Sequence, residues 1–171
     1  MSDIRQSPRK RTLAAIVGTT AAAALLTAVP KFEGVVLVAK PDPVGVVTAC
    51  FGETRGVKLG ERFTFSQCVA KLEPRLAEFA EAVDRCTPVA SMTVGQRKAV
   101  VDFAYNEGSG TYCRSSIAAN FRIGNVAAAC RSFNESPTGK PQYVTAAGQE
   151  LRGLVKRRAE ERAWCEGRET P

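Results

Sequence analysis

Residues 32–54 read FEGVVLVAKPDPVGVVTACFGET, and this stretch decides the fold. Near its start, Glu33 follows an apolar segment and precedes Gly34, where a helix is expected to end. Residues 41–43, Pro-Asp-Pro, then force a turn. β-Branched residues within 45–52 predict a strand in a small hairpin. We expect residues 35–38, Val-Val-Leu-Val, to pack behind the helix end.

The chain beyond this hairpin is predicted to be mainly helical. Residues 64–67, Thr-Phe-Ser-Gln, form a capping box that begins a helix to about Arg85, which Pro74 should kink. A second box at residues 93–96 begins a helix that stops at Gly108. Shorter helices are expected at 115–122, 126–134 and 150–165, with a loop at 135–148. The pattern predicts an α+β fold in which a small hairpin subdomain is joined by a linking helix to a helical lobe, with a cleft between them.

The composition is that of a folded protein whose chemistry does not use histidine. Of the 171 residues 44% are hydrophobic and 24% are charged, and the formal net charge is +7. No basic stripe with interleaved aromatic residues is present, so we do not expect nucleic-acid binding. The absence of histidine excludes Ser-His and Cys-His hydrolases and the usual zinc sites. We expect a monomer that needs no metal or cofactor.

Six cysteines lie after the first apolar segment, and none has the Cys-x-x-Cys spacing of a zinc or redox motif. In an exported domain an even set of cysteines predicts disulfides. Sequence alone leaves the pairing open. The choice that we favour joins neighbours along the chain: Cys50–Cys68, Cys86–Cys113 and Cys130–Cys165.

The N-terminus has the pattern of an export signal. Basic residues at 9–11 precede 18 uncharged residues at 12–29, which end at Pro30 and Lys31. The run can be interpreted as a buried core helix, a cleaved signal peptide or a signal anchor. It is rich in alanine and threonine, which give little free energy of insertion, so an anchor made of it would be held weakly. We favour an anchor that can leave the membrane, with the N-terminus inside the cell.

Glu33, Asp42 and Thr48 are the candidate catalytic residues. Partial burial at a helix end would raise the pKa of a carboxyl group at Glu33 and suit it to act as a general acid. Asp42 lies in a turn, where it should be solvated and ionised, and the Thr48 hydroxyl is suited to hold a water molecule. Two carboxyl groups in different environments across a cleft are the machinery of glycoside hydrolysis. Taken singly, each residue also has an ordinary structural role.

The spacing of these three residues and their flanking glycines resembles the phage-type lysozymes, glycoside hydrolase family 24. Two further blocks fit in the same order. Residues 103–108, FAYNEG, resemble the F-x-x-N-x-G segment of the family, and residues 153–162 resemble its terminal G-L-x-x-R-R-x-x-E block. The resemblance covers about residues 31–166. The chain departs from the family after Thr48, where Ala49 and Glu53 change the packing and charge of the hairpin.

The resemblance implies a lysozyme-like fold and cleavage of the β-1,4 bond between N-acetylmuramic acid and N-acetylglucosamine in peptidoglycan. Glu33 then matches the general acid, Asp42 the second carboxylate and Thr48 the water-positioning residue, in an inverting reaction. Asn106 would line the sugar cleft, although a position at the end of a helix explains it equally well. Whether Arg157 or Arg158 pairs with Glu33 stays open.

The resemblance extends to signal-anchor-release endolysins. It implies a basic N-terminus with a releasable segment at residues 1–30 and a catalytic domain at residues 31–171. The enzyme would begin at the host inner membrane, held through residues 12–29 with the catalytic domain in the periplasm, and then be released there to lyse the cell. The alternative from another class is an exported, non-catalytic module that binds the cell wall and is stabilised by disulfides.

Overall fold

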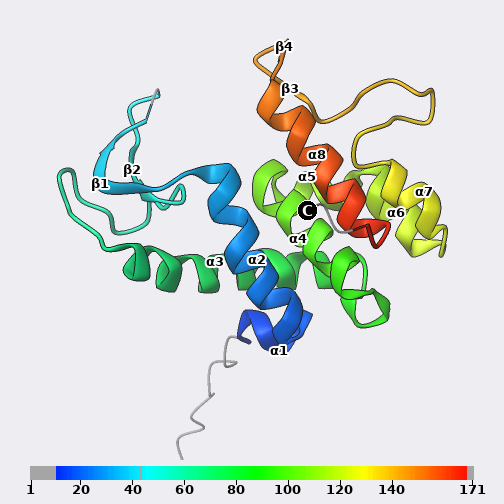
Figure 1. Ribbon diagram of the computed structural model, residues 1–171, viewed down its shortest axis with the longest axis horizontal. Helices are drawn as coiled ribbons and strands as arrows, with labels where there is room; N and C mark the ends of the chain where they lie inside the picture. The colour runs from blue at the N-terminus through cyan, green and yellow to red at the C-terminus, as the bar shows by residue number, and fades with distance from the viewer. Residues whose placement is uncertain (1–10, 43, 169–171) are drawn as a thin grey trace, which may run out of the picture.

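The computed structural model describes residues 11–42 and 44–168. A β-hairpin stands at one end of the molecule, and a long helix runs from it along the base into a lobe of packed helices (Figure 1). This confirms the α+β arrangement. The elements are α1 (Leu13–Val17), α2 (Thr19–Glu33), β1 (Val36–Pro41), β2 (Val47–Cys50), α3 (Phe65–Cys86), the short 3-10 helix η1 (Val89–Ser91), α4 (Val94–Glu107), α5 (Ser109–Arg114), α6 (Ser116–Arg122), α7 (Val126–Arg131), β3 (Thr145–Ala146), β4 (Gln149–Glu150) and α8 (Arg152–Cys165).

The hairpin follows directly from the end of α2, as expected. Gly34 ends the helix with a φ of +68°, which a glycine adopts without strain. Strands β1 and β2 then pair in antiparallel fashion, with Lys40 opposite Thr48. The prediction that residues 35–38 pack behind the helix end is wrong, because Val35 and Val38 are each 43% exposed. A two-stranded hairpin that projects from the body has few neighbours to cover them (Figure 1).

The uncharged run at residues 12–29 is folded into the core as α1 and α2. Leu13, Val17, Leu25 and Val29 are each fully buried. Gly18, with a φ of +86°, separates the two helices, a break that the sequence analysis did not predict. In this state the segment is therefore a buried core element. Among the residues that the structure describes, no helix combines the length and apolar character needed to span a membrane.

Polar side chains of α3 and α4 bind the two ends of α1. At its start, the backbone N–H of Leu13 donates to the Glu73 carboxylate at 2.7 Å. At its end, the Arg97 guanidinium donates to the carbonyl oxygen of Val17 at 3.1 Å and also to the carbonyls of Val89 and Ala90. Backbone groups that a short helix leaves unpaired are thus satisfied within the fold.

Both predicted capping boxes are confirmed, at Thr64–Gln67 of α3 and Thr93–Gln96 of α4. Helix α3 runs through Pro74 as one continuous helix, and α4 ends at Gly108 as expected. The final helix begins at Arg152, because residues 145–150 form the small hairpin β3–β4 in front of it.

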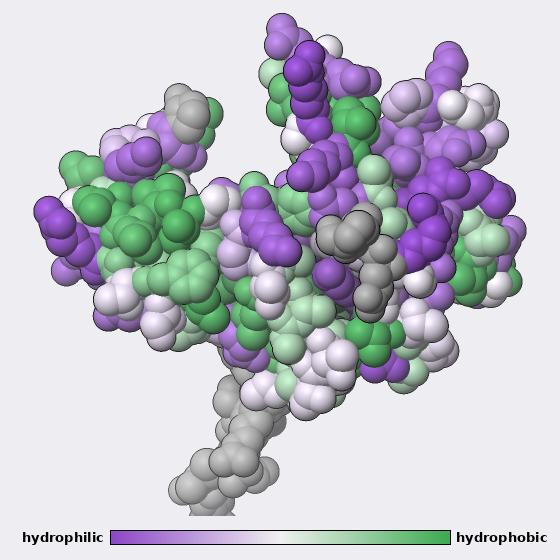
Figure 2. Space-filling view, in the orientation of Figure 1, coloured by the Kyte–Doolittle hydropathy of each residue, from purple (hydrophilic) through white to green (hydrophobic). Residues whose placement is uncertain are grey.

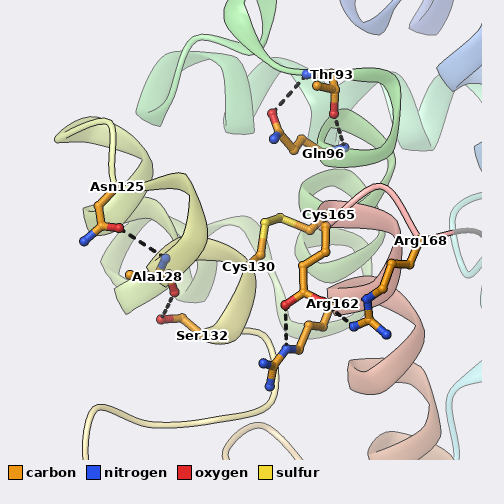
Figure 3. Close-up of a disulfide and its surroundings, with 10 residues drawn as sticks. Thr93, Gln96, Asn125, Ala128, Cys130, Ser132, Arg162, Cys165 and Arg168 are labelled. Carbon is orange, nitrogen blue, oxygen red and sulfur yellow. Dashed lines mark hydrogen bonds and ion pairs between the residues drawn. A yellow bond between two sulfur atoms is a disulfide. The ribbon is translucent and has the colours of Figure 1, made fainter.

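The helical lobe is centred on Phe103 of α4, which is fully buried. Its ring packs edge to face against those of Phe133 and Tyr143, with centroids 5.7 and 4.9 Å apart. The three expected disulfides, Cys50–Cys68, Cys86–Cys113 and Cys130–Cys165, are confirmed. Figure 3 shows the last of them joining α7 to the end of α8, close to the capping box at the start of α4.

Candidate active site

Glu33 is the last residue of α2 and lines a cavity of about 1450 Å³ bounded by α2, α4 and α8. Its side chain is 24% exposed, so it is partly buried as expected. The guanidinium of Arg157 donates to Glu33 Oε1 at 2.6 Å. The same guanidinium lies over the ring of Phe32, 4.8 Å from its centroid. The neighbouring α8 therefore holds the carboxylate in place.

Arg157 is itself fixed by Asp102 of α4 through a two-point contact. Its Nε and Nη2 atoms donate to the two carboxylate oxygens at 2.9 and 3.0 Å. The side chains of Arg157 and Asp102 are only 4% and 0% exposed. Burial lowers the pKa of Arg157, but Asp102 and Glu33 outweigh it and the net shift is upward. The guanidinium is therefore a permanent charge between the two carboxylates.

The adjacent Arg158 points into the lobe and makes a second buried cluster. It pairs with Glu161 at 2.8 Å, and both side chains are fully buried. It also donates to Asn106 Oδ1 at 2.8 Å. Burial raises the pKa of Glu161 well above its ordinary value and lowers that of Arg158. Arg157 thus contacts Glu33, while Arg158 orients the Asn106 side chain.

Asp42 and Thr48 lie on one face of the hairpin. Asp42 accepts the backbone N–H groups of Val44 and Val46 at 3.0 and 2.8 Å, which organises the turn. The Thr48 hydroxyl donates to the Val46 carbonyl at 3.0 Å. Because Lys40 pairs with Thr48 and the Asp42 N–H bonds Val46, side-chain alternation places Asp42 and Thr48 diagonally on the same face.

The structure therefore groups the predicted residues in two sets. Glu33 and Asn106 line the cavity, and Asn106 is also the penultimate residue of α4, while its contact with a sugar stays a prediction. Asp42 and Thr48 are on the hairpin and are not among the lining residues. The surface is hollowed between the hairpin β1–β2 and the projection formed by β3–β4 and the start of α8 (Figure 1 and Figure 2). Glu33 lies where α2 passes into that hairpin.

Comparison with known proteins decides the family. The family model described as "Phage lysozyme" matches residues 30–161. The SAR-endolysin of Enterobacteria phage P21 is 31% identical over 165 residues, which cover 93% of this chain and 95% of the relative. The SAR-endolysin of Enterobacteria phage PA-2 is 30% identical over 167 residues, with the same shares. The chain belongs to the phage lysozyme family. It is therefore a glycoside hydrolase of the lysozyme class, which degrades peptidoglycan.

The fold agrees with this membership. The crystal structure of the active form of the P1 phage endolysin Lyz matches with a TM-score of 0.71 at 25% identity, covering 86% of this chain and 83% of that one. The expected lysozyme-like arrangement is thereby confirmed.

In this phage lysozyme, Asp102 is a site residue that was not predicted from the sequence. A carboxylate within the apolar run Ala99–Phe103 was the available signal, since a buried acid needs a cationic partner. The role of Arg157 was also undecided from the sequence. In the part of the chain that the structure describes, no three acidic or cysteine side chains are grouped to hold a metal ion. That the enzyme acts without metal or cofactor stays a prediction.

Proposed function

We propose that Glu33 is the general acid for cleavage of the β-1,4 bond between N-acetylmuramic acid and N-acetylglucosamine. The observation that carries this proposal is the position of Glu33, whose partly buried side chain lines a cavity and is held by Arg157. A carboxyl group that is held in place beside a cavity can protonate the leaving glycosidic oxygen of a sugar bound there.

Asp42 and Thr48 are assigned to the attacking water. Their shared face on the hairpin suits them to hold one water molecule between a carboxylate and a hydroxyl. A water delivered from the side opposite the acid inverts the anomeric centre, which requires carboxyl groups roughly 6.5–9.5 Å apart. Asn106 would bind the sugar. Because Arg158 occupies its Oδ1, the amide nitrogen is the group that donates to a sugar oxygen.

The segment at residues 12–29 is assigned two successive roles, first as a weak membrane anchor and then as part of the core. Two relatives of similar length are named SAR-endolysins, which supports the first role. The burial of Leu13 and Leu25 supports the second, because cleavage after Ala28 would remove both from the core. The enzyme would thus pass from the host inner membrane to the periplasm. The division into a segment at residues 1–30 and a catalytic domain at residues 31–171 applies to its anchored state. Action as a monomer and without nucleic acid is part of this proposal.

The test uses the full chain on purified peptidoglycan and follows new reducing ends and new free amines separately. The wild type should release reducing ends only, and Glu33→Gln should release neither. Glu150→Gln, an exposed glutamate on β4, is the matched control and should behave as the wild type. If the folded wild type bound peptidoglycan without releasing reducing ends, the alternative of a non-catalytic wall-binding module would replace this proposal.

The two roles of residues 12–29 are tested in cells. The newly made chain should sediment with inner membranes, and the later soluble form should retain its full mass. A soluble form shortened by about the first 28 residues would instead indicate a cleaved signal peptide.

A further inference from the structure

Tyr105 of α4 lies at the contact between the helical lobe and the hairpin. Its hydroxyl donates to the carbonyl oxygen of Phe51 at 2.6 Å. Phe51 is 2% exposed and follows Thr48 by three residues, directly after β2. The Tyr105 ring packs edge to face on Phe79 of α3, with centroids 5.3 Å apart. One side chain therefore joins α4 and α3 to the turn that follows the hairpin.

The other contacts that hold this turn lead to α3. Cys50 forms its disulfide with Cys68 of α3. The Glu53 carboxylate accepts two backbone N–H groups of its own turn, at 2.9 and 2.7 Å, and lies 3.8 Å from Arg75 of α3. These contacts fix the turn against the linking helix. The hydroxyl of Tyr105 fixes it against α4.

The same part of α4 also positions Glu33. Asp102 precedes Tyr105 by three residues, which is about 4.5 Å along a helix axis. Asp102 holds Arg157, and Arg157 holds Glu33. Less than one turn of α4 therefore carries both connections, one to the acid and one to the strand of Thr48.

We propose that Tyr105 is a positioning residue that sets the hairpin, and with it the water held at Asp42 and Thr48, relative to Glu33. This inference rests on the proposed function. Protonation and water attack must be aligned on one sugar, and a displacement of the order of 1 Å can cost about a hundredfold in rate. The hydrogen bond to Phe51 supplies a direct link across the two subdomains.

The electrostatic surroundings agree with this role. Burial raises the pKa of Tyr105 to about 12, and the charge of Glu33 contributes in the same direction. A tyrosine hydroxyl is protonated at neutral pH already, and the raised pKa keeps this one able to donate at more alkaline pH as well. Glu33 is close enough for its charge to act on Tyr105.

The test compares Tyr105→Phe with Tyr112→Phe in the full chain. The first change keeps the ring and its contact with Phe79 but removes the donor. Tyr112 is the control, because its hydroxyl also takes part in a hydrogen bond, with Thr87, away from the hairpin. Tyr112 is fully buried, whereas Tyr105 is partly buried. We would measure kcat and KM for reducing-end release from uncross-linked strands of alternating N-acetylglucosamine and N-acetylmuramic acid, at a temperature where each variant is folded by circular dichroism.

Tyr105→Phe should lower kcat roughly tenfold and leave KM unchanged, whereas Tyr112→Phe should keep both. An unchanged kcat in Tyr105→Phe, or an equal fall in both variants, would overturn the role of Tyr105. If Tyr105→Phe does not fold at that temperature, both variants are compared at a lower temperature at which each is folded, with the same expected results. Glu33→Gln, assayed beside them, separates the two claims. Wild-type rates in that variant would overturn the proposed function, whereas an inactive Glu33→Gln beside a fully active Tyr105→Phe would overturn only this inference.

Discussion

The Nη1 atom of Arg157 lies 2.6 Å from Oε1 of Glu33, although 124 positions separate the two residues in sequence. Arg157 is also paired with Asp102, so one guanidinium joins α2, α4 and α8 at the candidate site. The position of Glu33 therefore depends on the packing of three helices and not only on the local sequence around it.

Arg157→Met should destabilise the protein by roughly 3–5 kcal/mol, because it leaves the Asp102 carboxylate buried without a cation. It should also lower kcat, since Glu33 loses its partner. Arg157→Lys keeps the charge but loses the two-point contact with Asp102, so its losses of stability and of kcat should both be smaller. Urea unfolding followed by circular dichroism measures the first effect.

Arg168→Met is the control and should change stability by no more than about 0.5 kcal/mol, because Arg168 is 64% exposed. Equal stability of Arg157→Met and the wild type would show that the buried pair is not required.

Leu25→Ala should cost about 2–5 kcal/mol, because Leu25 is fully buried in the core between α2 and the lobe. Leu26→Ala, the next residue of the same helix, removes a partly buried side chain and should cost about 1 kcal/mol. Chemical denaturation of the folded protein gives both values. The two values together measure how much the apolar segment at residues 12–29 contributes to the stability of the core. Equal, small losses at the two positions would indicate that α2 is only loosely attached.

The sequence predicted those features that depend on neighbouring residues. Capping boxes at Thr64 and Thr93 act within one helical turn, and Gly34 ends α2 through its own φ angle. The favoured pairing of neighbouring cysteines also proved correct, although the sequence alone left the pairing open, and the three bonds join residues 18 to 35 positions apart.

Features that depend on contacts between residues far apart in the chain could not be predicted from the sequence. The choice between Arg157 and Arg158 as the partner of Glu33 requires the rotation of α8 against α2 and α4, which helical periodicity does not fix. The burial of residues 35–38 failed as a prediction for a related reason. An apolar strand is buried only if another layer covers it, and here Val35 and Val38 project with the hairpin.

Removing the Cys130–Cys165 disulfide should destabilise the protein by about 4 kcal/mol, and removing Cys50–Cys68 by about 3 kcal/mol, on the chain-entropy account. The order follows from the loops that they close, which span 35 and 18 residues. Paired Cys→Ser variants and equilibrium unfolding measure both losses. The opposite order would show that local packing, and not loop closure, dominates. The Cys50–Cys68 variant should lose kcat in addition, since that bond holds the turn after Thr48.

Alkaline titration should show that the tyrosines resist ionisation while the protein is folded. Burial raises the pKa of Tyr105 and Tyr112 to about 12 and also raises that of Tyr143. These are the three tyrosines of the chain. Between pH 10 and 12 the unfolded chain loses protons that the folded chain keeps, so the stabilising contribution is full below pH 10 and is lost as the pH rises towards 12.

Phenolate absorbance in the ultraviolet measures this titration directly. Little phenolate should form near pH 10 in the native protein, and its appearance should coincide with unfolding. A tyrosine that titrates at its ordinary pKa with the fold intact would contradict the burial of that side chain. Tyr105→Phe and Tyr112→Phe assign each transition.

The rate of reducing-end release by full-length Glu33→Gln, compared with the wild type on the same peptidoglycan, tests the central claim most directly. The substitution removes the proton donor and keeps the size of the side chain. We expect the rate to fall by roughly 10²–10⁴-fold, while the thermal midpoint and the binding of peptidoglycan are retained. A folded Glu33→Gln variant that releases reducing ends at the wild-type rate would contradict the assignment of Glu33 as the general acid.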